Sequence, residues 1–255
     1  MLRFLAPLGL VFLIFTGMPS RAEPAINVFG PGGPAPAMKE AAETFGKKSN
    51  TKVEVVSGPT GAWLEKAKAE GDVIYSGSEV MMTDFVTAMS GQIIEETITP
   101  LYLRPAAVLV RPGNPKSIKG FADLLSRDLK VLVVNGAGQQ GLWEDMAGRT
   151  GEIAKVKALR AKIVAFAPNS AAARQTWTER PDIDAWIIWT IWQVSNPSLA
   201  DLIEVEPEYR IYRDTGVGLT RRGQGNPAAK EFVAYLRSPE GAAIFRKWGW
   251  IARSP

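Results

Sequence analysis

The sequence predicts an α/β fold made of two blocks, in each of which strands and helices alternate along the chain. Short apolar runs typical of strands are followed by helix-like stretches from residue 25 onward, and short loops between such units indicate largely parallel sheets. A longer extended segment at 102–111 interrupts this pattern, which starts again at residue 130. We therefore expect two lobes, with 102–111 and 204–218 crossing between them. A single doubly wound sheet is the alternative.

The first block is expected to contain three strand–helix units. Its strands are rich in β-branched and aromatic residues, which favour sheets, and lie at 25–29, 52–57 and 72–75. The helices that follow carry apolar residues at helical spacing and lie at about 36–48, 62–70 and 79–89. In the last of these, we expect Val80, Met81, Phe85 and Met89 on the inner face.

The second block is expected to repeat the pattern, with strands at 130–135 and 161–165. Helices are expected at 120–126, 139–149, 151–160 and 170–179, and two amphipathic helices follow at 227–238 and 240–247. The apolar run 184–192 carries Trp186, Trp189 and Trp192 at every third position. Such a stripe is typical of a core. The alternative is that Trp189 or Trp192 stands in a cleft and stacks on a ligand.

Residues 1–22 predict a secretory signal peptide. Arg3 provides a short positive head, residues 4–15 are almost entirely apolar, and small residues precede the expected cleavage site near Ala22. The apolar stretch is shorter than the ~20 residues that a membrane-spanning helix needs. We therefore expect a periplasmic protein, with a retained membrane anchor as the alternative.

The composition argues against most enzymatic sites. The chain has no cysteine and no histidine, which excludes disulfides, thiol chemistry, Ser–His–Asp hydrolysis and histidine-based zinc sites. We expect no catalytic activity, no cofactor and no metal site. The formal charge is +4 without a basic run, so we expect no nucleic-acid partner. We also expect a monomer.

Small, hydroxyl-bearing and amide residues gather where strands lead into helices. These loops lie at 30–34, 57–61, 76–78, 135–141 and 169–170. A helix N-terminus leaves backbone N–H groups unpaired and carries partial positive charge, so several such ends aimed at one point bind an anion. Each loop alone also fits ordinary capping and turn chemistry. The glycine-rich loop 135–141 lacks the spacing of a nucleotide-binding motif.

Three arginines are further candidates. Arg174 lies near the helix start at 169–170 and can hold a carboxylate or sulfate through two hydrogen bonds. The alternative is a solvated side chain. Arg104 and Arg111 flank the first crossing segment. We expect surface positions, and the alternative is that one of the two reaches the cleft.

These segments resemble periplasmic solute-binding proteins, and within them the molybdate/sulfate-binding group of the type II periplasmic binding protein superfamily. The motifs GPGGP at 30–34, YSGSE at 75–79 and NGAGQ at 135–139 resemble accessory colonization factor C, and the similarity extends over 26–250. The resemblance implies two lobes, each a mostly parallel sheet flanked by helices, joined by two crossing strands. It places 23–104 with 212–255 in lobe one and 105–211 in lobe two, with hinge crossings near 102–108 and 206–214.

The resemblance also implies a ligand site between the lobes. Carried over from oxyanion-binding members, its donors are Gly32, Gly33, Thr60, Gly61, Gly138, Gln139 and Gln140. The loop chemistry adds Ser76, Ser78 and Asn135, and the candidates Arg174 and Trp189 complete the set. Molybdate binders usually show serines where this chain has Gly32–Gly33 and Thr60–Gly61. A sulfate ester or a carboxylate is therefore as credible a ligand as molybdate or sulfate.

The sequence thus predicts a protein that captures a small anionic solute and delivers it to an ABC importer. Closure of the lobes around the ligand would supply the mechanism. The alternative is a colonization accessory factor that reports the bound solute to a chemoreceptor.

Overall fold

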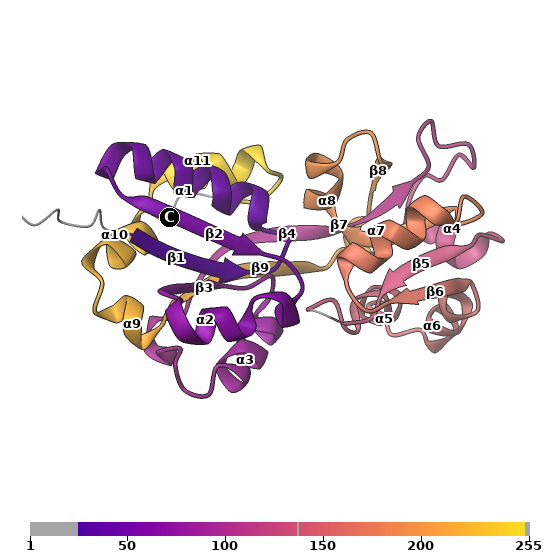
Figure 1. Cartoon of the computed structure of the whole chain (residues 1–255). Helices are drawn as coiled ribbons and strands as arrows, with labels where there is room; N and C mark the ends of the chain where they lie inside the picture. Colours follow the sequence, from indigo (N-terminus) through magenta and orange to yellow (C-terminus); the bar gives the residue numbers. More distant parts are fainter. Residues whose placement is uncertain (1–24, 137, 253–255) are drawn as a thin grey trace, which may run out of the picture.

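The computed structural model describes residues 25–136 and 138–252, which form two α/β lobes lying side by side (Figure 1). The predicted signal peptide at 1–22 lies outside the described residues. Two strands, β4 (Thr99–Val110) and β9 (Tyr212–Leu219), run between the lobes. The predicted two-lobed α/β architecture is confirmed.

Lobe one is built on the parallel strands β1 (Ala25–Gly30), β2 (Lys52–Ser57) and β3 (Val73–Tyr75). Strand β9 pairs antiparallel with β3. Helix α1 lies with α11 on one face of this sheet, and α2 with α3 on the other (Figure 1). The helices of this lobe are α1 (Ala35–Ser49), α2 (Leu64–Glu70), α3 (Glu79–Ala88), α9 (Arg221–Gln224), α10 (Pro227–Leu236) and α11 (Pro239–Lys247).

Lobe two contains β5 (Val131–Val134), with β6 (Ile163–Ala167) and β7 (Ala185–Trp189) parallel to it on either side. Strand β8 (Asp201–Glu204) pairs with β4. The helices of this lobe are α4 (Phe121–Ser126), α5 (Leu142–Gly148), α6 (Ile153–Arg160), α7 (Ser170–Glu179) and α8 (Thr190–Ser195).

Strand β4 changes partners in its middle. Residues 99–105 pair with β9, whereas residues 106–110 pair with β7, and 107–110 also pair with β8. Because of this exchange, the described strands form one nine-stranded sheet in the order β2-β1-β3-β9-β4-β7-β5-β6, with β8 beside β4. The passage between the lobes therefore lies next to Pro105.

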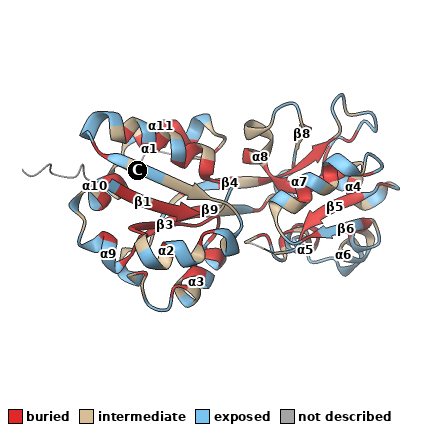
Figure 2. Cartoon of the chain, viewed as in Figure 1, coloured by how far each residue is buried: buried red, intermediate tan, exposed pale blue. Residues whose placement is uncertain are grey.

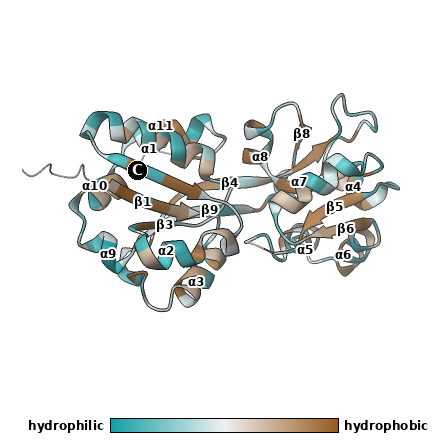
Figure 3. Cartoon of the chain, viewed as in Figure 1, coloured by the Kyte–Doolittle hydropathy of each residue, from teal (hydrophilic) through white to brown (hydrophobic). Residues whose placement is uncertain are grey.

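The core follows the strands of both lobes, which are buried and hydrophobic, while the outer faces of the helices are exposed and polar (Figures 2 and 3). Trp186 and Trp189 are both fully buried, and Trp186 packs against Trp177 with ring centroids 6.0 Å apart. Each such indole removes a large apolar area from water, which is the dominant favourable contribution to folding. Val80, expected on the inner face of α3, is 58% exposed, because the buried face of this helix is formed by Met81, Met82 and Phe85.

Several elements begin elsewhere than predicted, for local reasons. The apolar run 184–192 is divided between β7 and α8, a division that a continuous apolar run does not reveal. Strand β6 starts at Ile163 instead of residue 161, because the backbone N–H groups of Ala161 and Lys162 still donate to the last turn of α6. Helix α5 starts at Leu142, because Gly141 before it has a φ of 74°.

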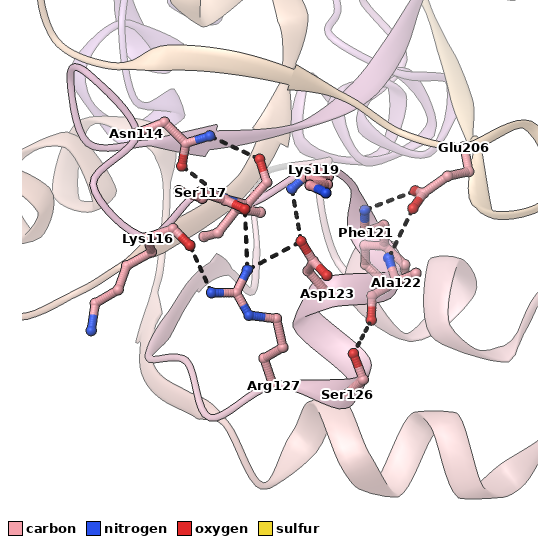
Figure 4. A network of polar contacts seen from close by, with 11 residues as sticks. Asn114, Lys116, Ser117, Lys119, Phe121, Ala122, Asp123, Ser126, Arg127 and Glu206 are labelled. Carbon is pink, nitrogen blue, oxygen red and sulfur yellow. Dashed lines mark hydrogen bonds and ion pairs between the residues drawn. The ribbon is translucent and has the colours of Figure 1, made fainter.

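A network of polar contacts fixes the segment that leads from β4 into α4 (Figure 4). The Glu206 carboxylate accepts hydrogen bonds from the backbone N–H groups of Phe121 (2.7 Å) and Ala122 (3.1 Å) at the start of α4. The Asp123 carboxylate accepts from the Lys119 N–H and from Arg127, at 2.8 and 3.2 Å.

None of the helices in the described part of the chain is long and apolar enough to cross a membrane.

Candidate ligand-binding site

A cavity of about 90 Å³ lies between the lobes. It is bordered by the loops that follow strands of both lobes, the position at which open α/β sheets bind ligands. Its walls are formed by Pro31, Gly32, Gly33, Pro34, Gly58, Pro59, Thr60, Gly77, Met81, Arg104, Gln139, Asn169, Ser170, Ala171, Trp189 and Trp192.

Arg104 provides the charge of this cavity. It lies on β4 just before the exchange of partners and is only 4% exposed. Its Nη2 donates to the backbone carbonyl of Gly77. The guanidinium carbon lies 4.6 Å from the ring centroid of Trp189 and 4.9 Å from that of Trp250, so two indoles hold the cation between them.

Two donors of Arg104 remain unused. Its Nε and Nη1 are buried and have no hydrogen-bond partner among the described residues. Burial lowers the pKa of the Arg104 guanidinium to about 9, while the nearby Asp214 carboxylate acts to raise this pKa and Arg213 acts to lower it. A buried cation is costly unless it is paired and hydrogen-bonded, and an anion in the cavity would supply both the charge and the acceptors.

Two long helices direct their N-termini toward the same cavity. Helix α1 begins at Ala35, directly after the lining residues Gly32, Gly33 and Pro34. Helix α7 begins at Ser170 and is capped by Asn169, whose side chain accepts from the Ala172 N–H. The positive ends of both helices add to the field of Arg104, so the cavity favours negative charge.

Lobe two contributes an amide and a hydroxyl. Gln139 is 4% exposed, and its Nε2 donates to Ser170 Oγ at 2.6 Å. Within the described chain, Gln139 Oε1 is buried without a partner. Both residues line the cavity, which therefore has hydrogen-bonding groups from lobe two opposite the loops of lobe one.

The structure brings together a part of the residues that the sequence predicted for the site. Gly32, Gly33, Thr60, Gln139 and Trp189 line the cavity. The hydroxyls of two predicted serines are used within the fold. Ser76 Oγ accepts from the Gly216 N–H, and Ser78 Oγ caps α3 by accepting from the Met81 N–H.

The other predicted residues lie outside the cavity walls. Gly61 belongs to a short 3₁₀ turn, and Gly138 lies against Ser78 and Met81 of lobe one. Asn135 and Gln140 border a separate depression on lobe two, together with Trp143 and Phe166. Arg174 is exposed on α7, away from the cavity lining.

The expectation of a surface position was wrong for Arg104, and the alternative, in which one of the two arginines reaches the cleft, describes it. Its side chain is buried because the Gly77 carbonyl and two indoles surround the guanidinium. A signal was present in the sequence, since Arg104 is the one charged residue between Thr99 and Val110. Arg111, also expected at the surface, is half-buried on the face of Trp177, 3.6 Å from the ring centroid, and donates to the backbone carbonyls of Ile183 and Trp177.

A resident metal centre has no support from the side chains. Within 25–136 and 138–252, no three histidine, cysteine, aspartate or glutamate residues gather closely enough to hold a metal ion. Arg104, the two helix N-termini and the Ser170 hydroxyl are groups that donate to anions or neutral acceptors, whereas Gln139 Oε1 is an acceptor.

Comparisons with known proteins agree with this geometry. Peb3 from Campylobacter jejuni is 36% identical in its crystal structure, with a TM-score of 0.83, over 89% of this chain and 100% of that chain. A crystal structure of PEB3 with bound L-phospholactate has the same identity and coverage and a TM-score of 0.84. No curated protein sequence matches the chain significantly.

More distant structures share the fold. The sulfate-binding protein SubI from Mycobacterium tuberculosis has a TM-score of 0.75 at 15% identity, over 91% of this chain and 88% of that chain. The periplasmic molybdate-binding protein of Azotobacter vinelandii has a TM-score of 0.67 at 16% identity, over 89% and 99%. These distant structures show the fold alone, whereas the family match and Peb3 confirm the solute-binding resemblance that the sequence motifs indicated. Residues 26–251 match the model of the family described as bacterial extracellular solute-binding protein, and the chain belongs to that family.

Proposed function

We propose that the protein captures a small organic anion between its lobes outside the cytoplasm and delivers it, chemically unchanged, to an ABC importer. The observation that carries this proposal is Arg104, a buried guanidinium with two unpartnered donors in the cavity between the lobes. The N-termini of α1 and α7 support it, because both border the same space.

A phosphate- or carboxylate-bearing organic anion fits the cavity better than a bare oxyanion. Pro31, Pro34 and Pro59 in the walls have no backbone N–H to donate. The side chains of Met81 and Trp192 add further apolar surface. An oxyanion such as sulfate or molybdate would leave oxygens facing these walls without donors, whereas an organic ligand can place carbon atoms there. The L-phospholactate bound to the similar protein PEB3 is a ligand of this class.

Lobe closure would then follow from the position of the donors. A ligand held by Arg104 and α1 on one side and by Gln139, Ser170 and α7 on the other binds best when the lobes are together. Such a ligand shifts the protein toward the closed state by its difference in affinity for the two states.

The first test is binding of four anions, namely L-phospholactate, inorganic phosphate, sulfate and molybdate, measured by isothermal titration calorimetry and thermal unfolding. At a concentration 100 times its Kd, a ligand stabilises the folded protein by about 2.7 kcal/mol. We expect L-phospholactate to raise Tm by several degrees and to bind more tightly than sulfate or molybdate. Absence of binding by all four anions would contradict the proposal.

Arg104→Met tests the residue that carries the proposal. Because the variant lacks the charge and its donors, we expect at least a 100-fold loss of L-phospholactate affinity, on the order of 3 kcal/mol. Arg174→Met is the matched control, since it removes the same charge from an exposed position of α7 and should bind as the unaltered protein does.

Delivery requires a separate test in cells. Uptake of labelled L-phospholactate should fall when the gene is deleted and recover with the unaltered protein but not with Arg104→Met. Unchanged uptake alongside intact binding in vitro would favour the chemoreceptor alternative.

A separate experiment distinguishes a binding protein from an enzyme. Recovery of the ligand unaltered after prolonged incubation, measured by ³¹P NMR, is expected for a binding protein, and turnover would favour an enzyme.

A further inference from the structure

Asp214 is a carboxylate close to Arg104 that does not belong to the cavity wall. It lies on β9, where its neighbour Arg213 pairs across the strands with Arg104 and Asp214 itself pairs with Leu103. Its Oδ1 accepts from the Glu79 N–H at 3.0 Å, at the start of α3. Its Oδ2 is buried and without a partner in the described residues.

The charges of Asp214 and Arg104 act on each other without direct contact. In the described structure, no ion pair within 4.0 Å joins them, yet Asp214 favours the charged form of Arg104. Both side chains bind the same loop, since Arg104 donates to the Gly77 carbonyl and Asp214 accepts from the Glu79 N–H. Asp214 is half-buried with its Oδ2 shielded from water, so water screens the two charges incompletely and they attract each other. Arg213 has a smaller electrostatic effect on Arg104 than Asp214 has, because the charge of Arg213 is partly balanced by Asp145 at 2.6 Å.

We propose that Asp214 sets the affinity of the site by offsetting the charge of Arg104 from behind the cavity. The inference rests on the proposed function, in which an anion binds to Arg104. A carboxylate near the guanidinium lowers the free-energy cost of burying that charge in the ligand-free protein. The same carboxylate repels the incoming anion. The site therefore binds more weakly than Arg104 and the helix ends alone would allow, which favours release of the ligand.

Asp214→Asn isolates this effect. The asparagine keeps the size of the side chain and an oxygen that can accept from the Glu79 N–H, so α3 retains its contact while the charge is lost. We expect the affinity for inorganic phosphate and for L-phospholactate to increase about ten-fold. Asp84→Asn is the control, because it removes the same charge from an exposed position of α3 and should leave both affinities unchanged.

A ligand-free experiment tests the coupling independently. Asp214→Asn should lower Tm when Arg104 is present, because the buried guanidinium loses its compensating charge. In the Arg104→Met background, the same substitution should leave Tm unchanged or raise it, since the carboxylate with its buried Oδ2 no longer has a cation nearby. A double-mutant cycle from these four proteins gives the interaction directly.

The outcomes separate the two proposals. If the unaltered protein binds phosphate or L-phospholactate and Asp214→Asn binds them equally or more weakly, the role of Asp214 is wrong and the proposed function stands. If no variant binds any anion, the proposed function fails. The affinity-setting role of Asp214 then falls with it, even where the ligand-free cycle shows coupling to Arg104.

Discussion

Arg104 lies where the two lobes meet, and its surroundings explain why an arginine occupies this position. The planar guanidinium fits between the indoles of Trp189 and Trp250, donates to the Gly77 carbonyl, and still has two donors for a ligand. A lysine ammonium offers neither the flat stacking surface nor the fixed fork of donors. We therefore expect Arg104→Lys to retain the charge but lose most of the anion affinity.

The pH dependence of anion binding should report Arg104. Burial lowers the pKa of the free guanidinium to about 9, and only the charged form attracts an anion. The affinity for L-phospholactate should therefore be constant from about pH 7.5 to 8.5 and fall by up to ten-fold per unit above about pH 9. Calorimetric titrations across this range check it, and Arg174→Met should show the same decline. A constant affinity up to about pH 10.5 would contradict the prediction.

Gly33 provides a test of the first loop. A β-carbon at this position would lie 3.5 Å from Ile191 Cδ1 and 3.8 Å from Trp192 Nε1, which are ordinary contacts. Gly33→Ala should therefore fold and bind normally, whereas Gly33→Asp places a carboxylate beside the cavity and should abolish anion binding. Both variants are compared by calorimetry with L-phospholactate, and equal affinities would remove the loop from the site.

The loops of the site could be predicted from the sequence, whereas its charged residue, Arg104, could not. Gly32, Gly33 and Gln139 stand in loops between strands and helices, where strand order alone brings them to one edge of the sheet. The position of Arg104 depends on Trp250, which lies 146 residues further along the chain. Contacts of that range leave no periodic pattern. The single charge between Thr99 and Val110 marks Arg104 as unusual in the sequence, but it does not reveal the indoles that bury its guanidinium.

Among the elements, α4 shows how a distant residue determines where a helix starts. It has six residues and no side-chain cap of its own, and its first N–H groups are satisfied by Glu206 from the segment before β9. Gly120 before the helix leaves room for that carboxylate. The sequence placed the helix correctly at 120–126, but the residue that caps it was not recognisable.

Glu206→Ala should destabilise lobe two. The substitution leaves two N–H groups of α4 without their acceptor and removes a negative charge from the helix N-terminus, at a cost of about 1–2 kcal/mol. We expect Tm to fall by roughly 3–6 °C with anion affinity little changed. Glu208→Ala is the control, because this exposed carboxylate makes no such contacts. Equal Tm values for the two variants would contradict the prediction.

At the scale of the whole molecule, the two lobes touch beside the cavity and at a surface ion pair. The loop of Gly138 in lobe two lies against Ser78 and Met81 of lobe one. Arg213 on β9 pairs with Asp145 on α5 at 2.6 Å. Both side chains of this ion pair are partly exposed, so the pair contributes little to the association of the lobes. The close approach at Gly138 is more sensitive to substitution.

Gly138→Val should hold the lobes apart. A β-carbon there would lie 2.7 Å from Ser78 Oγ, closer than real β-carbons approach, and in tight contact with Met81 Cε at 3.0 Å. We expect a larger radius of gyration by small-angle X-ray scattering and weaker L-phospholactate binding. Gly141→Val is the matched control, because Gly141 has a similar φ of 74° and a β-carbon there would meet no atom of the described residues within 4 Å. Identical scattering by the two variants would contradict the prediction.

The tryptophans around the cavity have a practical consequence. Two of the eight in the chain, Trp189 and Trp192, form part of its walls, and Trp189 faces the Arg104 cation. Indole emission responds to nearby charge and to water, so an anion that neutralises Arg104 and displaces water from the cavity should alter the intrinsic fluorescence. The protein thus carries its own optical reporter, with which an unlabelled sample can be screened for the solutes it takes up.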